Sequence, residues 1–169
     1  MEKYEEYGYN IQNGKIIIPE WETEIKEGAF EGCSNLTSVS IPPSVTQIGY
    51  DAFKGCSSLA SVSIPPSVTK IENYVFSDCP SLASIIVSKD NKIYDSREDC
   101  NAIIHTESNT LIRGCENTII PPSVTEIGDY AFSGCSNLAS GSIPPIGNGL
   151  RTGYSLVAPV SQESPFPHR

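Results

Sequence analysis

The six cysteines of this 169-residue chain are its residues best suited to chemistry, because a cysteine can form a disulfide, bind a metal or act as a nucleophile. Four recur at one position of a repeated pattern, at Cys33, Cys56, Cys79 and Cys135. Each lies near apolar residues, so we expect buried free thiols that behave as small hydrophobic side chains. Stacked in parallel, these side chains would also lack the geometry that a disulfide needs.

The other two cysteines, Cys100 and Cys115, lie outside the repeated position. They flank a predicted hairpin, and two alternatives stay open for them: a disulfide between the two, or two free thiols. A zinc site is not predicted, because the chain has no Cys-x-x-Cys pair and no closely spaced pair of histidines.

Histidines and carboxylates give no catalytic or metal-binding pattern. The two histidines, His105 and His168, are not part of a Ser-His-Asp or Cys-His spacing motif, although a triad assembled in space is invisible in sequence. Asp95, Glu98 and Asp99 form an acidic group, but they lack the spacing and the glycine of a calcium loop. We therefore expect a solvated acidic loop and predict no enzyme, no cofactor and no catalytic, cofactor-binding or metal-binding residue.

These side chains belong to a sequence unit that repeats every 23 residues. Phe30, Phe53 and Phe76 keep this spacing, as do the first three cysteines of the repeated position. The hexapeptide IPPSVT occurs three times, beginning at Ile41, Ile64 and Ile120. Such a period is typical of solenoids, in which stacked coils bury a shared core that a single coil cannot form alone.

Each part of the unit has a physical role. Val39 and Ile41 alternate with serines, which is the period of a half-buried strand. The two prolines of IPPSVT then end the strand, because proline cannot donate a backbone hydrogen bond. The phenylalanine fills the core, and the glycine that follows suits a left-handed residue at the end of a turn. Asp78 replaces this glycine once, and aspartate tolerates that conformation better than most residues.

The pattern IPxSVTxIGxxAFxGCxxLxxVxIP, which covers roughly Lys15 to Pro145, resembles the BspA-type, or Treponema pallidum-type, leucine-rich repeat. The resemblance implies an α/β-type leucine-rich-repeat solenoid, with one parallel β-sheet and with turns and short helical pieces on the convex side. It also implies a surface or secreted protein of a bacterium, or of some protozoa, that acts in adhesion or binds host extracellular proteins.

Residues 88–119 interrupt the repeat and predict one enlarged coil. Two coils in this space would each be shorter than the usual minimum of about 20 residues. The short apolar runs 102–105 and 110–113, separated by the polar residues 106–109, indicate a β-hairpin. The stretch YDSREDCNAII also resembles an elongated unit of the same repeat family.

The chain therefore divides into an N-terminal segment (1–14), a solenoid (15–145) and a C-terminal tail (146–169). The tail lacks the repeat pattern, so we expect it to form no further coil and to be poorly ordered. The N-terminus MEKYEEYGYN lacks the basic start and apolar stretch of a signal peptide. A surface or secreted location therefore implies a fragment without its leader, and a cytoplasmic protein is the alternative.

Charge narrows the classes of partner. A net charge of −9 and a pI near 4.6 disfavour nucleic acid and anionic membranes. No apolar run approaches the roughly 20 residues of a membrane span. Two hypotheses remain: a protein-binding or adhesion module, for instance for a host extracellular matrix protein, or a structural spacer without a ligand of its own. The sequence does not indicate the oligomeric state.

The best candidate contact surface is the outward face of the predicted sheet. Strand alternation points one residue of each coil outward just before its inward isoleucine or valine. These residues are Ser40, Ser63, Ile86, Ile119 and Ser142. If the enlarged coil loops out, the strands of Ile86 and Ile119 are neighbours and form a small apolar patch. We expect this patch to contact a partner or, alternatively, to be covered by the hairpin or the tail.

Overall fold

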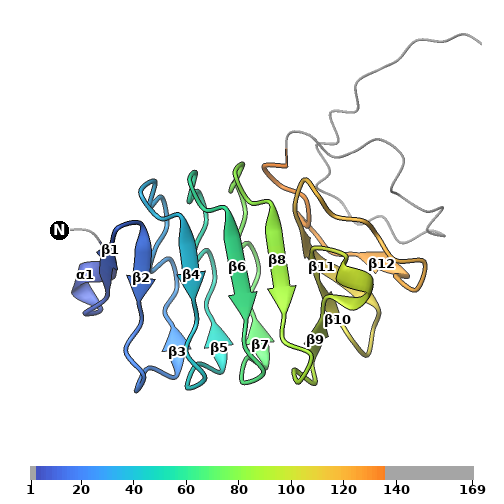
Figure 1. The fold of residues 1–169 in the computed structure, drawn as a ribbon, viewed down its shortest axis with the longest axis horizontal. Helices are drawn as coiled ribbons and strands as arrows, with labels where there is room; N and C mark the ends of the chain where they lie inside the picture. Colours follow the sequence, from blue (N-terminus) through green and yellow to red (C-terminus); the bar gives the residue numbers. More distant parts are fainter. Residues whose placement is uncertain (1–2, 136–169) are drawn as a thin grey trace, which may run out of the picture.

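The chain forms a β-solenoid whose coils lie side by side along one axis (Figure 1). The computed structural model describes residues 3–135. One strand from each coil enters a five-stranded sheet of order β1-β2-β4-β6-β8, in which β2 to β8 pair in parallel. The strands are β1 (Asn10–Gln12), β2 (Lys15–Ile17), β4 (Ser38–Ser40), β6 (Ser61–Ile64) and β8 (Ser84–Val87).

A narrower parallel ladder runs along the other side of the coils. It consists of β3 (Glu24–Ile25), β5 (Gln47–Ile48) and β7 (Lys70–Ile71). Its register joins Ile25 to Ile48 and Ile48 to Ile71, and the larger sheet joins Val39 to Val62 by the same shift. The 23-residue period of the sequence is therefore one coil of the structure.

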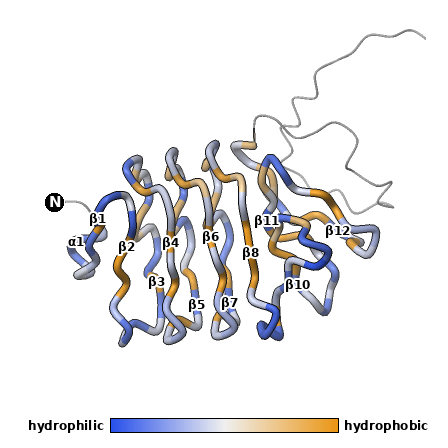
Figure 2. Tube along the Cα trace, viewed as in Figure 1, coloured by the Kyte–Doolittle hydropathy of each residue, from blue (hydrophilic) through white to orange (hydrophobic). Residues whose placement is uncertain are grey.

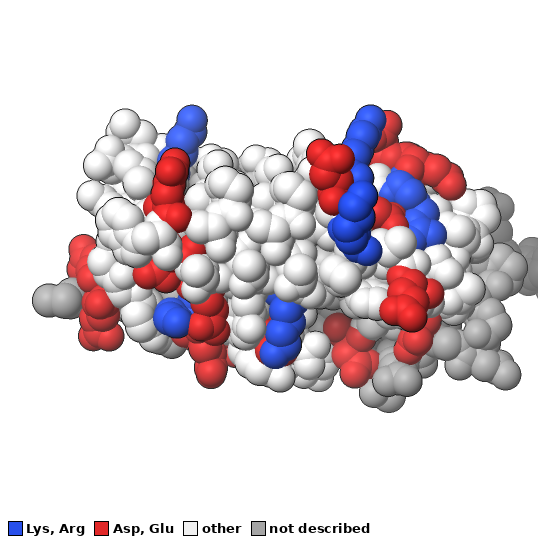
Figure 3. Space-filling view, turned by 90° about the horizontal axis from the view of Figure 1, so that it is seen from below, with Lys and Arg blue, Asp and Glu red and all other residues white. Residues whose placement is uncertain are grey.

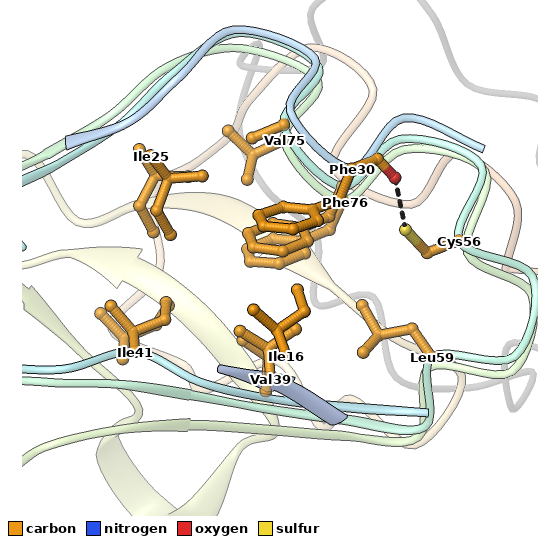
Figure 4. Close-up of a cluster of buried hydrophobic side chains, with 14 of the residues drawn as sticks. Ile16, Ile25, Phe30, Val39, Ile41, Cys56, Leu59, Val75 and Phe76 are labelled. Carbon is orange, nitrogen blue, oxygen red and sulfur yellow. Dashed lines mark hydrogen bonds between the residues drawn. The ribbon is translucent and has the colours of Figure 1, made fainter. Parts of the chain in front are cut away.

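Three stacked phenylalanines occupy the centre of the core. The ring centroids of Phe30 and Phe53 are 5.1 Å apart, and those of Phe53 and Phe76 are 5.4 Å apart, with interplanar angles of 6° and 5°. Figure 4 shows the stack between the two ladders, with Ile25 on one side and Val39 on the other. Apolar residues recur on the strands, and hydrophilic residues gather at the turns (Figure 2). The predicted in-register stacking is confirmed.

The IPPSVT segments form the corners at which each coil leaves the five-stranded sheet. The Val45 N–H donates to Pro42 O (3.1 Å) and closes a turn directly after β4. The N–H of Thr46 then donates to Thr23 O (2.8 Å), and the N–H of Thr69 donates to Thr46 O (2.9 Å). The corner threonines therefore link successive coils where the prolines have no N–H to donate.

A left-handed residue follows each core phenylalanine. Gly32, Gly55 and Gly134 have φ angles of 72°, 71° and 78°, and Asp78 takes the equivalent position with φ of 56°. Glycine adopts this conformation without steric cost, and aspartate tolerates it better than most residues. The prediction for this position, including its aspartate variant, is confirmed.

The chain departs from the regular coil after β8. β9 (Tyr94–Asp95), η1 (Arg97–Asp99), β10 (Ala102–His105) and β11 (Thr110–Gly114) follow, and β12 (Glu126–Ile127) completes a sheet of order β12-β11-β10-β9. β10 and β11 form the predicted antiparallel hairpin, joined by residues 106–109. β11 pairs in parallel with β12, so the parallel arrangement resumes beyond the hairpin.

Asn91 fixes the start of this departure. Its side-chain amide donates to Pro65 O and Val68 O, both at 2.9 Å, and its Oδ1 accepts the N–H groups of Ile93 and Tyr94, both at 2.9 Å. Asn91 is buried and lies 23 residues after Val68, at the position of the inward corner valine. One polar side chain therefore organises the turn where the IPPSVT corner is missing.

The N-terminal segment covers the first coil. α1 (Lys3–Glu6) leads into β1, and β1 forms an antiparallel hairpin with β2. The hairpin turn, Asn13-Gly14, has φ of 51° and 75°, as a tight two-residue turn requires. Tyr9 is buried and its ring lies 5.0 Å from that of Phe30. An aromatic ring thus extends the phenylalanine stack, which the sequence reasoning had not predicted.

The predicted solenoid of parallel strands with one hairpin-bearing coil is confirmed. One detail needs correction: the described strands divide over three sheets. The corner separates the main strand of each coil from a second short strand, and the enlarged coil begins a third sheet. The convex side consists of turns, and the described helices are α1 and η1. The predicted tail and Ser142 lie outside the described residues.

Candidate interaction surface

The outward face of the five-stranded sheet is lined mostly by serine. Parallel register sets its two rows, because alternate side chains of a strand point to the same face. The pairing of Lys15 with Ser38 carries over, two residues further, to Ile17 and Ser40. The first row is Lys15, Ser38, Ser61 and Ser84, and the second is Ile17, Ser40, Ser63 and Ile86.

The second row has an exposed isoleucine at each end. Ile17 is 53% exposed and Ile86 is 57% exposed, whereas Ser40 and Ser63 lie between them. Strands are spaced by about 4.8 Å, so the two isoleucines are about 14 Å apart. The sequence reasoning missed Ile17, although the repeat could have indicated it, because Ile17 precedes Ser40 by one period of 23 residues.

Ile119 is also exposed, at 68%, but it is not the direct neighbour of Ile86. The N–H of Val87 donates to Ser96 Oγ (3.0 Å), and the N–H of Ile119 donates to Cys100 O (3.1 Å). The segment from Ser96 to Cys100 therefore lies between the two. The predicted adjacency was wrong, because the chain fills this gap with η1 before it enters the hairpin.

The repeat that builds this surface matches a known family. A family model described as BspA type Leucine rich repeat region matches in six copies, over residues 4–104 and 113–151. The chain belongs to the BspA-type leucine-rich repeat family. No curated protein matches it.

Several solved structures resemble this BspA-type chain. A leucine rich cell surface protein from Faecalibacterium prausnitzii A2-165 is 33% identical, with a TM-score of 0.62 over 72% of this chain and 33% of that one. The T. pallidum leucine rich repeat protein is 28% identical (TM-score 0.47, 74% and 54% coverage). The pneumococcal vaccine antigen PcpA is 18% identical (TM-score 0.50, 74% and 44% coverage) and shares the fold. The chain thus spans between a third and about half of these proteins.

The cysteines of this BspA-type solenoid are all free. The Cys56 thiol lies 3.1 Å from Phe30 O, and the Cys79 thiol lies 3.2 Å from Phe53 O, so each thiol donates to the preceding coil (Figure 4). Burial raises the pKa of Cys56 and raises the pKa of Cys79 to about 11. The predicted ladder of buried free thiols is confirmed, and Cys100 and Cys115 take the free alternative.

The acidic group near η1 is partly engaged by the protein itself. Arg97 donates from Nε and Nη2 to the two oxygens of Asp95, each at 2.7 Å, and Thr106 Oγ1 donates to Asp95 at 3.1 Å. Burial acts to raise the pKa of Asp95, but these hydrogen bonds outweigh it and the pKa lies below its usual value. Glu98 and Asp99 are exposed as predicted, whereas a solvated role for Asp95 was wrong.

His105 forms contacts within the hairpin region. His105 Nδ1 lies 3.1 Å from Ser108 Oγ, and its ring meets Tyr94 edge-on at 5.8 Å. Within residues 3–135, no three His, Cys, Asp or Glu side chains gather as a metal site. In the same part of the chain, no helix has the length and apolar content to cross a membrane. His168 lies outside the described residues.

Proposed function

We propose that this chain is a non-enzymatic protein-binding or adhesion module of a bacterial surface or secreted protein. The partner binds the outward face of the five-stranded sheet. One observation carries the proposal: Ile17 and Ile86 are each more than half exposed at the ends of a row whose other members are serines, and Ile119, beyond the segment from Ser96 to Cys100, is exposed as well. A surface location is supported by the Faecalibacterium protein, which is described as a cell surface protein.

The shape and charge of the face suit a protein. Its small serines form a flat surface, and Lys15 is the one charged residue in its two outward rows. Seen from the side of the corners, the middle of the solenoid is also largely uncharged (Figure 3). A partner can therefore approach closely and bury the isoleucines, which contributes about 25 cal/mol for each Å² of apolar surface removed from water.

The contact set consists of Ile86 and Ile119 with Ser40 and Ser63 of the second outward row. Ser142, which was predicted to belong to this set, lies outside the described residues. The family resemblance makes a host extracellular matrix protein the first partner to test. A spacer without a ligand is the second candidate, and it is favoured by the absence of Tyr, Trp and Arg from the two outward rows, since these residues anchor most interfaces.

Replacing the exposed isoleucines tests whether the chain is a binding module or a spacer. Ile86→Ser combined with Ile119→Ser should lower the affinity for a bound matrix protein about tenfold, because a loss of about 1.4 kcal/mol is a factor of ten. The measurement is surface plasmon resonance against a panel of purified extracellular matrix proteins. Both side chains are exposed, so the free energy of unfolding should change by less than about 0.5 kcal/mol.

Tyr50→Ser is the matched control. Tyr50 is 44% exposed and follows β5, away from the five-stranded sheet, so its loss should leave the affinity unchanged. Ser63→Arg is a second test, because a long charged side chain in the middle of the face should block binding without disturbing the core. Absence of binding to the whole panel by the unaltered chain would favour the spacer.

A further inference from the structure

The backbone ladder on the turn side of the solenoid is interrupted after Phe76. In a regular coil the core phenylalanine donates its N–H to the next coil, as Phe53 does to Val75 O (2.9 Å). The equivalent carbonyl beyond Phe76 is Ala131 O, and it accepts the N–H of Gly114 in β11 instead (2.8 Å). We call this break, between residues 72–77 and 128–130, the seam.

Arg113 supplies the other donors at the seam. Its Nη1 donates to Tyr130 O (3.2 Å), and its Nη2 donates to Ser133 O (2.8 Å). Arg113 is buried, with 4% of its surface exposed, and its Nε–H has no acceptor. Among the described residues it forms no ion pair. A buried cation without an anionic partner is costly, so the site favours an occupant that supplies negative charge.

The carboxylates near the seam are engaged or exposed. Glu72 pairs with Lys70 at the surface. Asp78 accepts a hydrogen bond from Ser133 Oγ (2.8 Å), and Asp129 is exposed. None of the three forms a hydrogen bond or ion pair with Arg113.

A hollow of about 70 Å³ lies at the seam. Arg113 lines it together with Phe76, Tyr74 and Tyr130, and the acidic residues Glu72 and Asp129 also border it. A single water needs about 10–15 Å³ by a comparable measure, and a cavity of about 150 Å³ holds benzene. The hollow therefore has room for a group of about three or four heavy atoms, which is the size of a carboxylate on one carbon.

Two tyrosines form walls of the hollow. The rings of Tyr74 and Tyr130 meet edge-on with centroids 4.8 Å apart, and both residues are about two-fifths exposed. Their backbones are left-handed, with φ of 61° and 57°, where the earlier coils have Gly28 and Asp51. A large side chain is unusual in this conformation, and such residues are concentrated at binding sites.

We propose that the hollow binds a carboxylate. A carboxylate oxygen faces the Arg113 guanidinium from the hollow, and the attached carbon packs against Tyr74 and Tyr130. A charge-assisted hydrogen bond from a guanidinium is about twice as strong as a neutral one. The carboxylate can belong to an acidic side chain, to a chain terminus or to a free small acid. This site lies on the turn side of the coils, so it is separate from the sheet face proposed above.

The test is an NMR titration that observes the arginine Nε–H groups of the ¹⁵N-labelled chain. Sodium acetate is added against sodium chloride at equal ionic strength, and acetamide serves as the neutral analogue of the same shape. The Arg113 Nε–H signal should shift and saturate with acetate, with at least tenfold weaker responses to acetamide and chloride. N-acetylglycine and N-acetylaspartate α-amide then distinguish a terminal carboxylate from a side-chain carboxylate.

Tyr130→Gly tests the wall while keeping the fold, because Gly28 occupies the equivalent left-handed position. This variant should weaken the acetate response at least tenfold. The Ile86→Ser, Ile119→Ser variant should keep the full response, so failure of the sheet-face proposal would not affect this one. An equal shift with chloride, a response that never saturates, or unchanged acetate binding by Tyr130→Gly would overturn the proposal.

Discussion

The regular coils and the enlarged coil join neighbouring segments in different ways. From β2 to β8, backbone groups pair in a constant register, and identical side chains stack on one another. After β8, single polar side chains supply some of these hydrogen bonds: Asn91 organises the missing corner, and Arg113 donates to the turn carbonyls of Tyr130 and Ser133. A repeat can therefore be interrupted where buried side chains replace the lost backbone hydrogen bonds.

The largest expected loss of stability comes from a substitution in the core of the regular coils. Phe53 is completely buried between Phe30 and Phe76, so Phe53→Ala should lower the free energy of unfolding by about 3–5 kcal/mol. Urea unfolding followed by circular dichroism measures the change, and Tyr50→Ala is the exposed aromatic control. A loss below about 1 kcal/mol would contradict in-register stacking.

Asn91→Ala tests the corner at the start of the enlarged coil. The substitution removes four hydrogen bonds and leaves buried backbone groups unpaired, so we expect a loss of about 2–3 kcal/mol in the same assay. Asn73→Ala, an exposed asparagine in the preceding coil, should cost less than about 0.5 kcal/mol. Equal effects of the two substitutions would show that the Asn91 side chain does not organise the corner.

Gly114→Ala in β11 and Gly32→Ala in a regular coil compare how closely side chains pack in the two regions. An added Cβ at Gly114 would overlap the Phe132 ring at Cε1, so overpacking should cost about 2 kcal/mol. Gly32→Ala in a regular coil meets no atom within 4 Å and should cost about 1 kcal/mol through its left-handed backbone alone. Thermal unfolding compares the two, and a larger loss for Gly32→Ala would count against close packing of Phe132 on β11.

The smallest effect concerns the thiol ladder and pH. The folded pKa of Cys79, about 11, lies above its unfolded value of about 9, so the native state holds this proton more tightly. The resulting stability is complete below about pH 9 and is lost as the pH rises through 11. Between pH 8 and 10 the loss should be about 1 kcal/mol. Cys79→Ala should show a correspondingly weaker pH dependence in urea unfolding, and an unchanged dependence would contradict burial of this thiol.

The sequence predicted the parts of the fold that repeat. Phe53 and Cys56 recur with their equivalents at fixed spacing, so their stacking follows from the period, and Asp78 was recognised as a substitute for glycine by its position. The outward orientation of Ile86 followed from strand alternation in the same way. Ile17 was missed even though one more step of the period leads to it.

The remaining features depend on contacts between segments that follow no period. Asn91 reads as a polar loop residue in the sequence, and its role appears only when Pro65 and Val68 lie beside it. The same holds for Arg113, whose acceptors are 17 and 20 residues further along the chain. The position of η1 between Ile86 and Ile119 also followed from no sequence pattern, so their adjacency was predicted wrongly.

Contact between the sheet face and a protein partner is tested most directly by site-specific photo-cross-linking. The photoreactive residue p-benzoylphenylalanine replaces Ile86 in one variant and Tyr50 in another, and each is irradiated with the extracellular matrix protein that the unaltered chain binds. We predict a cross-linked product from position 86 that excess unaltered chain suppresses, and none from position 50. Equal yields at both positions, or no product at position 86 while the matrix protein still binds, would contradict this contact.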